Sequence, residues 1–215
     1  APYQRLREDN GCALNIKEED LRQKVREKRI GNTFLFAVDA SGSMGARERM
    51  RAVKGAIFYM LQEAYQKRDR VGMIAFRRDK ADLLLPITRS VDLAQKRLAE
   101  MPTGGKTPLA DGLALSLQTL ALLNKRDSEL EPILIVVTDG RANAVHEGEK
   151  EPVAAAINIA EKIAKAKITS VVIDTESDFI KLGIAKKLAA AMQANYYTLQ
   201  RLSKENIIHI VRNLH

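Results

Sequence analysis

Five oxygen-bearing side chains stand where apolar runs of this chain end or where a glycine-rich loop turns. They are Asp39, Ser41, Ser43, Thr107 and Asp139. Side chains at the ends of neighbouring strands can converge on one point, and carboxylate and hydroxyl oxygens suit hard divalent cations. Three of these five donors are neutral hydroxyls, so much of the cation's charge would stay uncompensated. The pattern predicts a metal site that accepts one more carboxylate from a partner protein, with Mg²⁺ expected and Mn²⁺ or Ca²⁺ as alternatives.

The same residue types also serve in caps and turns. Ser43 could cap a helix, and Asp139-Gly140 is a common turn pair. The metal site is favoured because three separated segments would otherwise have to match by chance. Gly105-Lys-Thr107 resembles the end of a phosphate-binding loop, but that motif needs a glycine at position 100, where this chain has Glu100.

Four polar residues flank the proposed ligands and are candidates for partner binding. They are Arg47, Arg49, Arg141 and Asn143. These side chains could orient a partner's carboxylate through charge-assisted hydrogen bonds, or they could brace the loops, and both roles stay open. No residue is expected to be catalytic, because no general base stands beside the ligands. The histidines, none of which has a Ser or Cys partner in a recognisable motif, are His146, His209 and His215. A binding domain is therefore expected rather than a self-sufficient enzyme.

The elements that must position these residues alternate between strands and helices. Strands are predicted at 33–38, 71–76, 81–85, 132–137, 168–173 and 195–199. Helices are predicted at 49–66, 90–100, 108–123, 153–165, 179–191 and 204–213. The polar turn at 77–80 indicates a hairpin with one antiparallel edge strand. The predicted fold is α/β, with a doubly wound, mostly parallel six-stranded sheet and helices on both faces. Residues 1–31 form an N-terminal arm or linker, and residues 32–215 form the domain.

Composition limits the class of protein. The net charge of +8 permits acidic partners, but aromatic residues make up only 5% and none alternates with the basic clusters, so no specific nucleic-acid binding is expected. No apolar run is long enough to cross a bilayer. The single cysteine, Cys12, excludes an internal disulfide and fits the cytoplasm. The first residue is not Met, so a fragment of a longer polypeptide is expected.

The three metal-site segments together resemble a known arrangement. Asp39-Ala-Ser-Gly-Ser43, Thr107 in its Gly-Gly-x-Thr-Pro loop and Asp139-Gly140 are similar to the metal-ion-dependent adhesion site of the von Willebrand factor A (integrin I-type) fold. The order and spacing match, and the resemblance covers roughly residues 32–215. It implies a Rossmann-like domain that binds partner proteins through its metal.

Further segments resemble the C-terminal region of the D-subunit family of magnesium chelatases. They include Ala1-Pro-Tyr-Gln4, Arg68-Asp-Arg-Val71, Ile74-Ala-Phe-Arg77, Leu83-Leu-Leu-Pro86 and Thr138-Asp-Gly-Arg-Ala-Asn143. The resemblance implies two partners, an AAA+ ATPase and a large catalytic subunit, in a complex that inserts Mg or a related metal into a tetrapyrrole. Arg78 departs from the pattern, which has glycine there. Two alternatives remain: a stand-alone von Willebrand A scaffold for another cytosolic AAA+ complex, and a basic RNA-associated domain.

Overall fold

The computed structural model describes residues 32–41, 46–67, 69–101, 103–127, 130–142, 151–176 and 182–198. The chain divides into two units, Ala1–Ile30 and Gly31–His215, and all described residues belong to the second. The predicted helix at 204–213, Cys12 and the three histidines lie outside the described residues.

A six-stranded sheet with the order β3-β2-β1-β4-β5-β6 forms the centre of the domain. Its strands are β1 (Thr33–Asp39), β2 (Arg70–Arg77), β3 (Lys80–Thr88), β4 (Pro132–Thr138), β5 (Thr169–Asp174) and β6 (Asn195–Thr198). All neighbours are parallel except β2 and β3, which form a hairpin at one edge. The predicted mostly parallel sheet with one antiparallel edge strand is confirmed.

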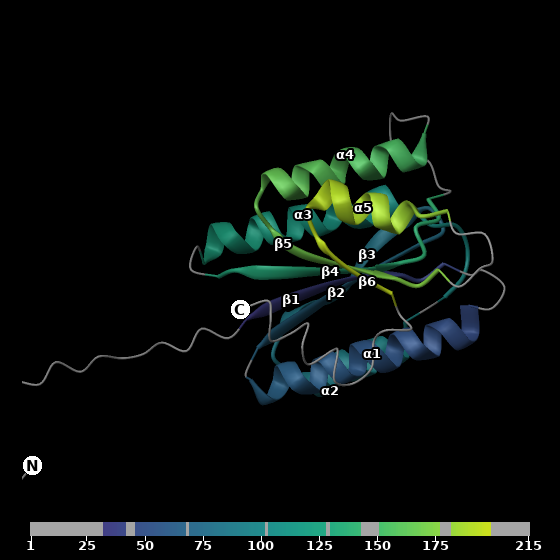
Figure 1. Ribbon diagram of the computed structural model, residues 1–215. Helices are drawn as coiled ribbons and strands as arrows, with labels where there is room; N and C mark the ends of the chain where they lie inside the picture. The colour runs from purple at the N-terminus through teal and green to yellow at the C-terminus, as the bar shows by residue number, and fades with distance from the viewer. Residues whose placement is uncertain are drawn as a thin grey trace, which may run out of the picture. The chain divides into compact units, whose positions relative to one another are not determined.

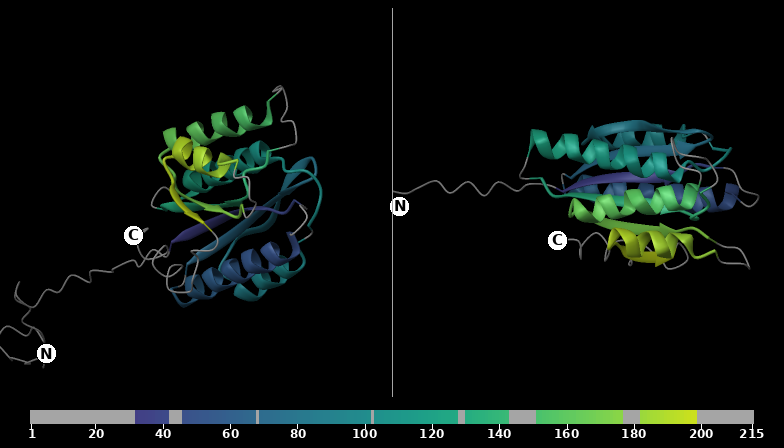
Figure 2. Two further views of the ribbon diagram at one scale, coloured as in Figure 1. Left: turned by 45° about the vertical axis from the view of Figure 1, so that its right-hand side comes forward. Right: turned by 90° about the horizontal axis from the view of Figure 1, so that it is seen from above.

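Helices cover both faces of this sheet (Figures 1 and 2). They are α1 (Ala46–Gln66), α2 (Val91–Ala99), α3 (Leu109–Arg126), α4 (Pro152–Lys165) and α5 (Ile184–Met192). Helices α1 and α2 pack on one face and α3, α4 and α5 on the other. Strand β1 serves both cores, since Phe34 and Phe36 face the first and Leu35 faces the second. This double burial explains why the central strands are continuous apolar runs.

Two helix boundaries have local causes. Ser90 caps α2 by accepting a hydrogen bond from the backbone N–H of Leu93 at 3.2 Å. The predicted start of α5 at residue 179 is wrong, because the helix begins at Ile184. Gly183 precedes it with a φ of 65°, a left-handed conformation that cannot continue a right-handed helix. Among the helices of the described residues, none is long and apolar enough to span a membrane.

Candidate metal centre

Two adjacent parallel strands bring Asp39 and Asp139 together at the carboxyl ends of the sheet's strands. Asp39 is the last residue of β1, and Asp139 directly follows β4. The two strands are in register up to the pair Val38 and Val137. The strand order reverses between β1 and β4: from β1 the chain continues outward to β2 on one side, and from β4 it continues outward to β5 on the other. Ligands of doubly wound sheets bind at this switch point, outside the carboxyl ends of the strands.

Hydrogen bonds hold the Asp39 carboxylate in one orientation. Its Oδ1 accepts from the backbone N–H of Ser41 at 2.9 Å, and its Oδ2 accepts from the Thr138 hydroxyl at 3.2 Å. The Thr138 oxygen in turn accepts from the backbone N–H of Gly140 at 3.0 Å. Thr138 therefore links the residue at the end of β1 to the turn that follows β4.

Thr138 is a residue of the candidate site that the sequence prediction missed. It is fully buried at the end of an otherwise apolar strand, where a polar side chain needs a partner. A threonine directly before the proposed ligand Asp139 was the available signal. The pattern alone could not show that its hydroxyl reaches Asp39, which is 99 residues earlier in the chain.

Asp139 is oriented by Arg141. Oδ1 of Asp139 accepts from the backbone N–H of Arg141 at 3.0 Å, and Oδ2 lies 3.8 Å from the Arg141 Nε. Asp139 is only 7% exposed, so its carboxylate has little access to water. Of the two roles open for Arg141, the structure contains the contact needed for loop bracing. Orientation of a partner's carboxylate stays a prediction.

The electrostatics of the two carboxylates favour a bound cation. Burial, followed by the nearby charge of Asp139, raises the pKa of Asp39 to about 7, although hydrogen bonds from Ser41 and Thr138 oppose the shift. Two carboxylates in a poorly hydrated site repel each other unless a positive charge or a proton lies between them. The donor chemistry thus fits a hard cation. No three His, Cys, Asp or Glu side chains gather among the described residues, so hydroxyls would have to complete the ligand set.

Thr107 lies in a loop that is joined to the end of β1. The backbone N–H of Gly104 donates to the Ala40 carbonyl at 2.8 Å, which attaches this loop beside the Asp39 segment. Thr107 is buried, and α3 begins two residues later at Leu109. The structure therefore joins the segments of four predicted ligands: Asp39, Ser41, Thr107 and Asp139. Ser43, Asn143 and the side chains of Arg47 and Arg49 lie outside what the structure describes.

A second carboxylate pair follows β5 but is engaged in other contacts. Asp174 accepts from the Tyr196 hydroxyl and, at 2.8 Å, from the backbone N–H of Glu176. Glu176 accepts from the backbone N–H groups of Leu182 at 2.7 Å and Gly183 at 3.4 Å. These bonds join Glu176 to Leu182 and Gly183, the two residues directly before α5. The sequence prediction missed this pair too, and its hydrogen bonds make it a structural clamp rather than a further ligand set.

Known proteins resemble this chain over most of its length. An uncharacterized protein of Methanocaldococcus jannaschii is 46% identical over 80% of the chain and 98% of that protein. The magnesium-chelatase 67 kDa subunit of Heliobacterium mobile is 36% identical over 99% of the chain. The chain spans 33% of that subunit's length, so the similarity covers one part of that subunit.

Solved structures share the fold. The BatB protein of Bacteroides thetaiotaomicron has a TM-score of 0.65 at 20% identity, over 86% of this chain and 98% of that one. Proximal thread matrix protein 1 of the mussel byssus, described with zinc in its MIDAS motif, has a TM-score of 0.60 at 18% identity, over 85% of this chain and 46% of that one.

Two family models match the chain in succession. The AAPxQ domain matches residues 1–26, and the von Willebrand factor type A domain matches residues 34–142. The second match includes β1, β4 and the whole candidate metal centre between them. The chain belongs to the von Willebrand factor type A domain family.

Proposed function

We propose that this chain is a metal-dependent protein-interaction domain of a chelatase-type complex. The residues that would hold Mg²⁺, directly or through water, are Asp39, Ser41, Ser43, Thr107 and Asp139. A Glu or Asp of a partner protein would complete the ligand shell. One observation carries the proposal: Asp39 and Asp139 lie at the ends of adjacent strands, where burial and mutual repulsion raise the pKa of Asp39 to about 7.

The chain's own residues prepare this site. The backbone N–H of Ser41 and the hydroxyl of Thr138 orient Asp39, and Arg141 orients Asp139. Ligands that are fixed before binding lose little conformational freedom when they bind. A bound cation would supply the positive charge that offsets the carboxylate repulsion and a position for the partner's carboxylate. Neither step requires a catalytic residue in this chain.

The relatives support particular partners. Similarity to magnesium-chelatase subunits supports an AAA+ ATPase subunit and a large catalytic subunit, with insertion of Mg or a related metal into a tetrapyrrole as the process they carry out. In this proposal the domain passes ATP-driven movement of the ATPase ring to the inserting subunit through the metal-mediated contact. Arg47, Arg49, Arg141 and Asn143 are proposed to steer the partner's carboxylate towards the metal.

A second candidate is a stand-alone scaffold for a different AAA+ complex. The archaeal relative favours this candidate. The alignment with this chain covers 98% of the archaeal protein, which therefore has little beyond this domain. Both candidates use the same metal contact, and the identity of the ATPase that binds distinguishes them.

Calorimetric titration with Mg²⁺ followed by binding of the ATPase partner tests the proposal. Asp39→Asn removes a ligand charge while relieving the repulsion with Asp139, so this variant should fold at least as stably as the wild type. We expect it to bind neither Mg²⁺ nor the partner. Asp82→Asn is the matched control, because Asp82 pairs with Lys80 at 3.2 Å in the edge hairpin. It should bind both as the wild type does.

Partner binding that is equal with Mg²⁺, with a chelator and with Asp39→Asn would refute the metal-dependent contact. Binding of Mg²⁺ without binding of the chelatase ATPase would leave the metal site standing and reject the chelatase assignment. In that case a different AAA+ protein would have to show the metal-dependent interaction.

A further inference from the structure

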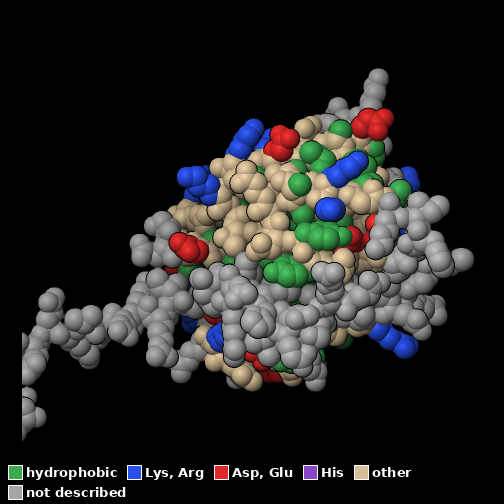
Figure 3. All heavy atoms as spheres, viewed as in Figure 1, with side chains coloured by type: hydrophobic (Ala, Val, Ile, Leu, Met, Phe, Trp, Pro, Cys, Tyr) green, Lys and Arg blue, Asp and Glu red, His purple; other side chains and the backbone are tan. Residues whose placement is uncertain are grey.

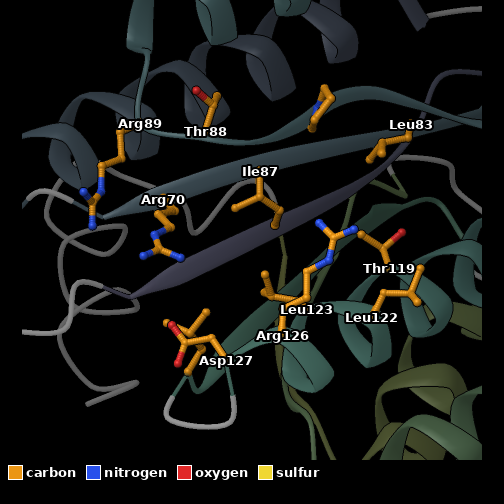
Figure 4. A pocket seen from close by; sticks show the side chains of 12 residues that line it. Arg70, Leu83, Ile87, Thr88, Arg89, Thr119, Leu122, Leu123, Arg126 and Asp127 are labelled. Atoms are coloured by element: carbon orange, nitrogen blue, oxygen red, sulfur yellow. The ribbon is translucent and has the colours of Figure 1, made fainter.

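A groove of about 720 Å³ lies between the edge strand β3 and the C-terminal half of α3 (Figure 4). Aliphatic side chains face each other across it, with Leu83 and Ile87 from β3 and Leu122 and Leu123 from α3. Its volume is within the range of about 300–1,000 Å³ that is typical of ligand sites.

The groove exposes apolar surface that the domain does not cover. Leu83 is 42% and Leu122 is 52% exposed, and only two other large apolar side chains are exposed in the described part of the chain. Contact of a partner with these two leucines would remove that surface from water. Clustered exposed apolar residues with a polar rim are typical of interaction sites.

The shape of the groove depends on a close contact within the sheet. Ile87 packs over Gly72 of β2, where an added Cβ would lie 3.1 Å from the Ile87 Cδ1. Because Gly72 has no side chain, the Ile87 side chain can pack directly on the backbone of β2. The edge strand also contains Pro86, which offers no backbone N–H for pairing with another strand. A partner is therefore expected to use side-chain contacts with the groove rather than extension of the sheet.

Three arginines and one carboxylate surround the apolar floor. Arg70 and Arg89 lie together at one end, and Arg126 extends from α3 towards the strands, while Asp127 lies below Arg70 in this view (Figure 4). Within the described residues, no ion pair neutralises any of these three arginines. The face shown in Figure 3, by contrast, carries both acidic and basic side chains among its described residues. The rim is thus complementary to acidic groups.

We propose that this groove binds a short acidic segment of a partner protein. Apolar side chains of the segment insert between Leu83 and Leu122, and its carboxylates pair with Arg70, Arg89 and Arg126. A nucleic acid fits less well, because the lining is aliphatic and contains no aromatic ring on which a base could stack.

The basic end of this surface, at Arg70, is distant from the candidate metal centre. Arg70 pairs with Thr33 at the start of β1, whereas Asp39 is at the end of β1 opposite Phe76. At the rise of a parallel strand, these two ends are about 20 Å apart. Leu83 lies nearer to the Asp39 end, because it pairs with Ile74 of β2. A partner in the groove therefore does not need the metal, and one protein could contact both sites only by extending along the sheet.

Fluorescence anisotropy with the full chain tests the proposal. The probe is a short fluorescein-labelled peptide in which pairs of Glu alternate with pairs of Leu. We expect saturable binding that EDTA leaves unchanged. The double variant Arg70→Glu/Arg126→Glu and the single variant Leu122→Ser should each weaken binding by about tenfold or more. Hydrogen exchange should slow in β3 and in the second half of α3.

The controls match the substitutions in chemistry and exposure. Leu182 is 50% exposed outside the groove, so Leu182→Ser should bind the peptide as the wild type does. Lys165→Glu reverses an exposed charge at the end of α4 and should also have no effect beyond a small change in long-range attraction. Absence of saturable binding, or equal losses in these controls, would overturn the proposal. Tighter binding of a single-stranded oligonucleotide at the same arginines would overturn it in favour of nucleic acid.

Discussion

Thr138 connects the two strands that carry the carboxylates of the candidate metal centre. Its buried hydroxyl donates to Asp39 at 3.2 Å and accepts from the Gly140 backbone at 3.0 Å. Thr138→Val keeps the shape of the side chain but removes the hydroxyl that hydrogen-bonds the Asp39 carboxylate and the Gly140 backbone N–H. We expect the free energy of unfolding to fall by about 1–3 kcal/mol, as measured by urea denaturation. Mg²⁺ binding should weaken by about 10–100-fold in calorimetry, because Asp39 loses the contact that orients it.

Thr138→Ser is the matched control for this prediction. It retains the hydroxyl and should restore most of the metal affinity, with a modest loss of stability from the missing methyl group. Unchanged metal binding by Thr138→Val would show that Thr138 is structural only.

The phenol of Tyr196 makes the free energy of unfolding depend on pH in the alkaline range. Burial, and then the hydrogen bond to Asp174, raise the pKa of Tyr196 to about 12. The folded chain thus holds this proton more tightly than the unfolded chain, in which the pKa of tyrosine is about 10. The resulting stabilisation is complete below the unfolded-state pKa and is lost as the pH rises from about 10 to 12. Urea denaturation at several pH values should show a shallower decline for Tyr196→Phe than for the wild type. Identical slopes would contradict this role.

At the scale of elements, the β2–β3 hairpin carries a strained residue. Arg78 has a φ of 57°, and the chain returns at once, since Arg77 pairs with Lys80. The resemblance to chelatase D subunits predicts a glycine here, and the left-handed φ accounts for that preference. Arg78→Gly should raise the free energy of unfolding by about 0.5–1 kcal/mol in urea denaturation. Arg77→Gly, one residue earlier in the regular strand, should lower it, and equal effects at both positions would disprove the strain.

The same hairpin contacts the loop that leads to Thr107. An added Cβ on Gly105, whose φ is 96°, would lie 2.5 Å from the Arg78 Cγ. The turn at Arg78 therefore packs closely against the loop at Gly105. A change in the turn is expected to alter the packing of this loop beside the candidate metal centre. This contact gives Arg78 a second effect, because its glycine variant would leave more space next to Gly105.

At the scale of the whole molecule, the sheet could be predicted because its signals are local. The apolar runs of β1 and β4 and the polar turn of the hairpin are visible in the sequence, and they determine the strand types and the edge at which Asp39 and Asp139 meet. The start of α5 could not be predicted, because it depends on a left-handed Gly183 that Glu176 holds from seven residues earlier. The contact of Thr138 with Asp39 likewise forms only when distant segments come together.

Because the candidate metal centre joins β1, β4 and the loop before α3, a cation there should stabilise the whole domain. A ligand that binds only the folded state raises the free energy of unfolding by about 2.7 kcal/mol at one hundred times its dissociation constant. For a domain of this size, that corresponds to a rise of roughly 5–10 °C in melting temperature. Calorimetric melting with Mg²⁺ should show this rise, and EDTA should reverse it.

The variants separate this effect from general ionic stabilisation. Asp39→Asn should melt at the same temperature with and without Mg²⁺, whereas Asp82→Asn should respond as the wild type does. The acidic peptide should add its own increment in all of them, since Arg70 and Asp39 are at opposite ends of the strand pair and distant sites contribute additively. A wild-type melting temperature that does not change with Mg²⁺ would contradict the metal site. A peptide-induced rise that disappears in Asp39→Asn would contradict the independence of the two surfaces.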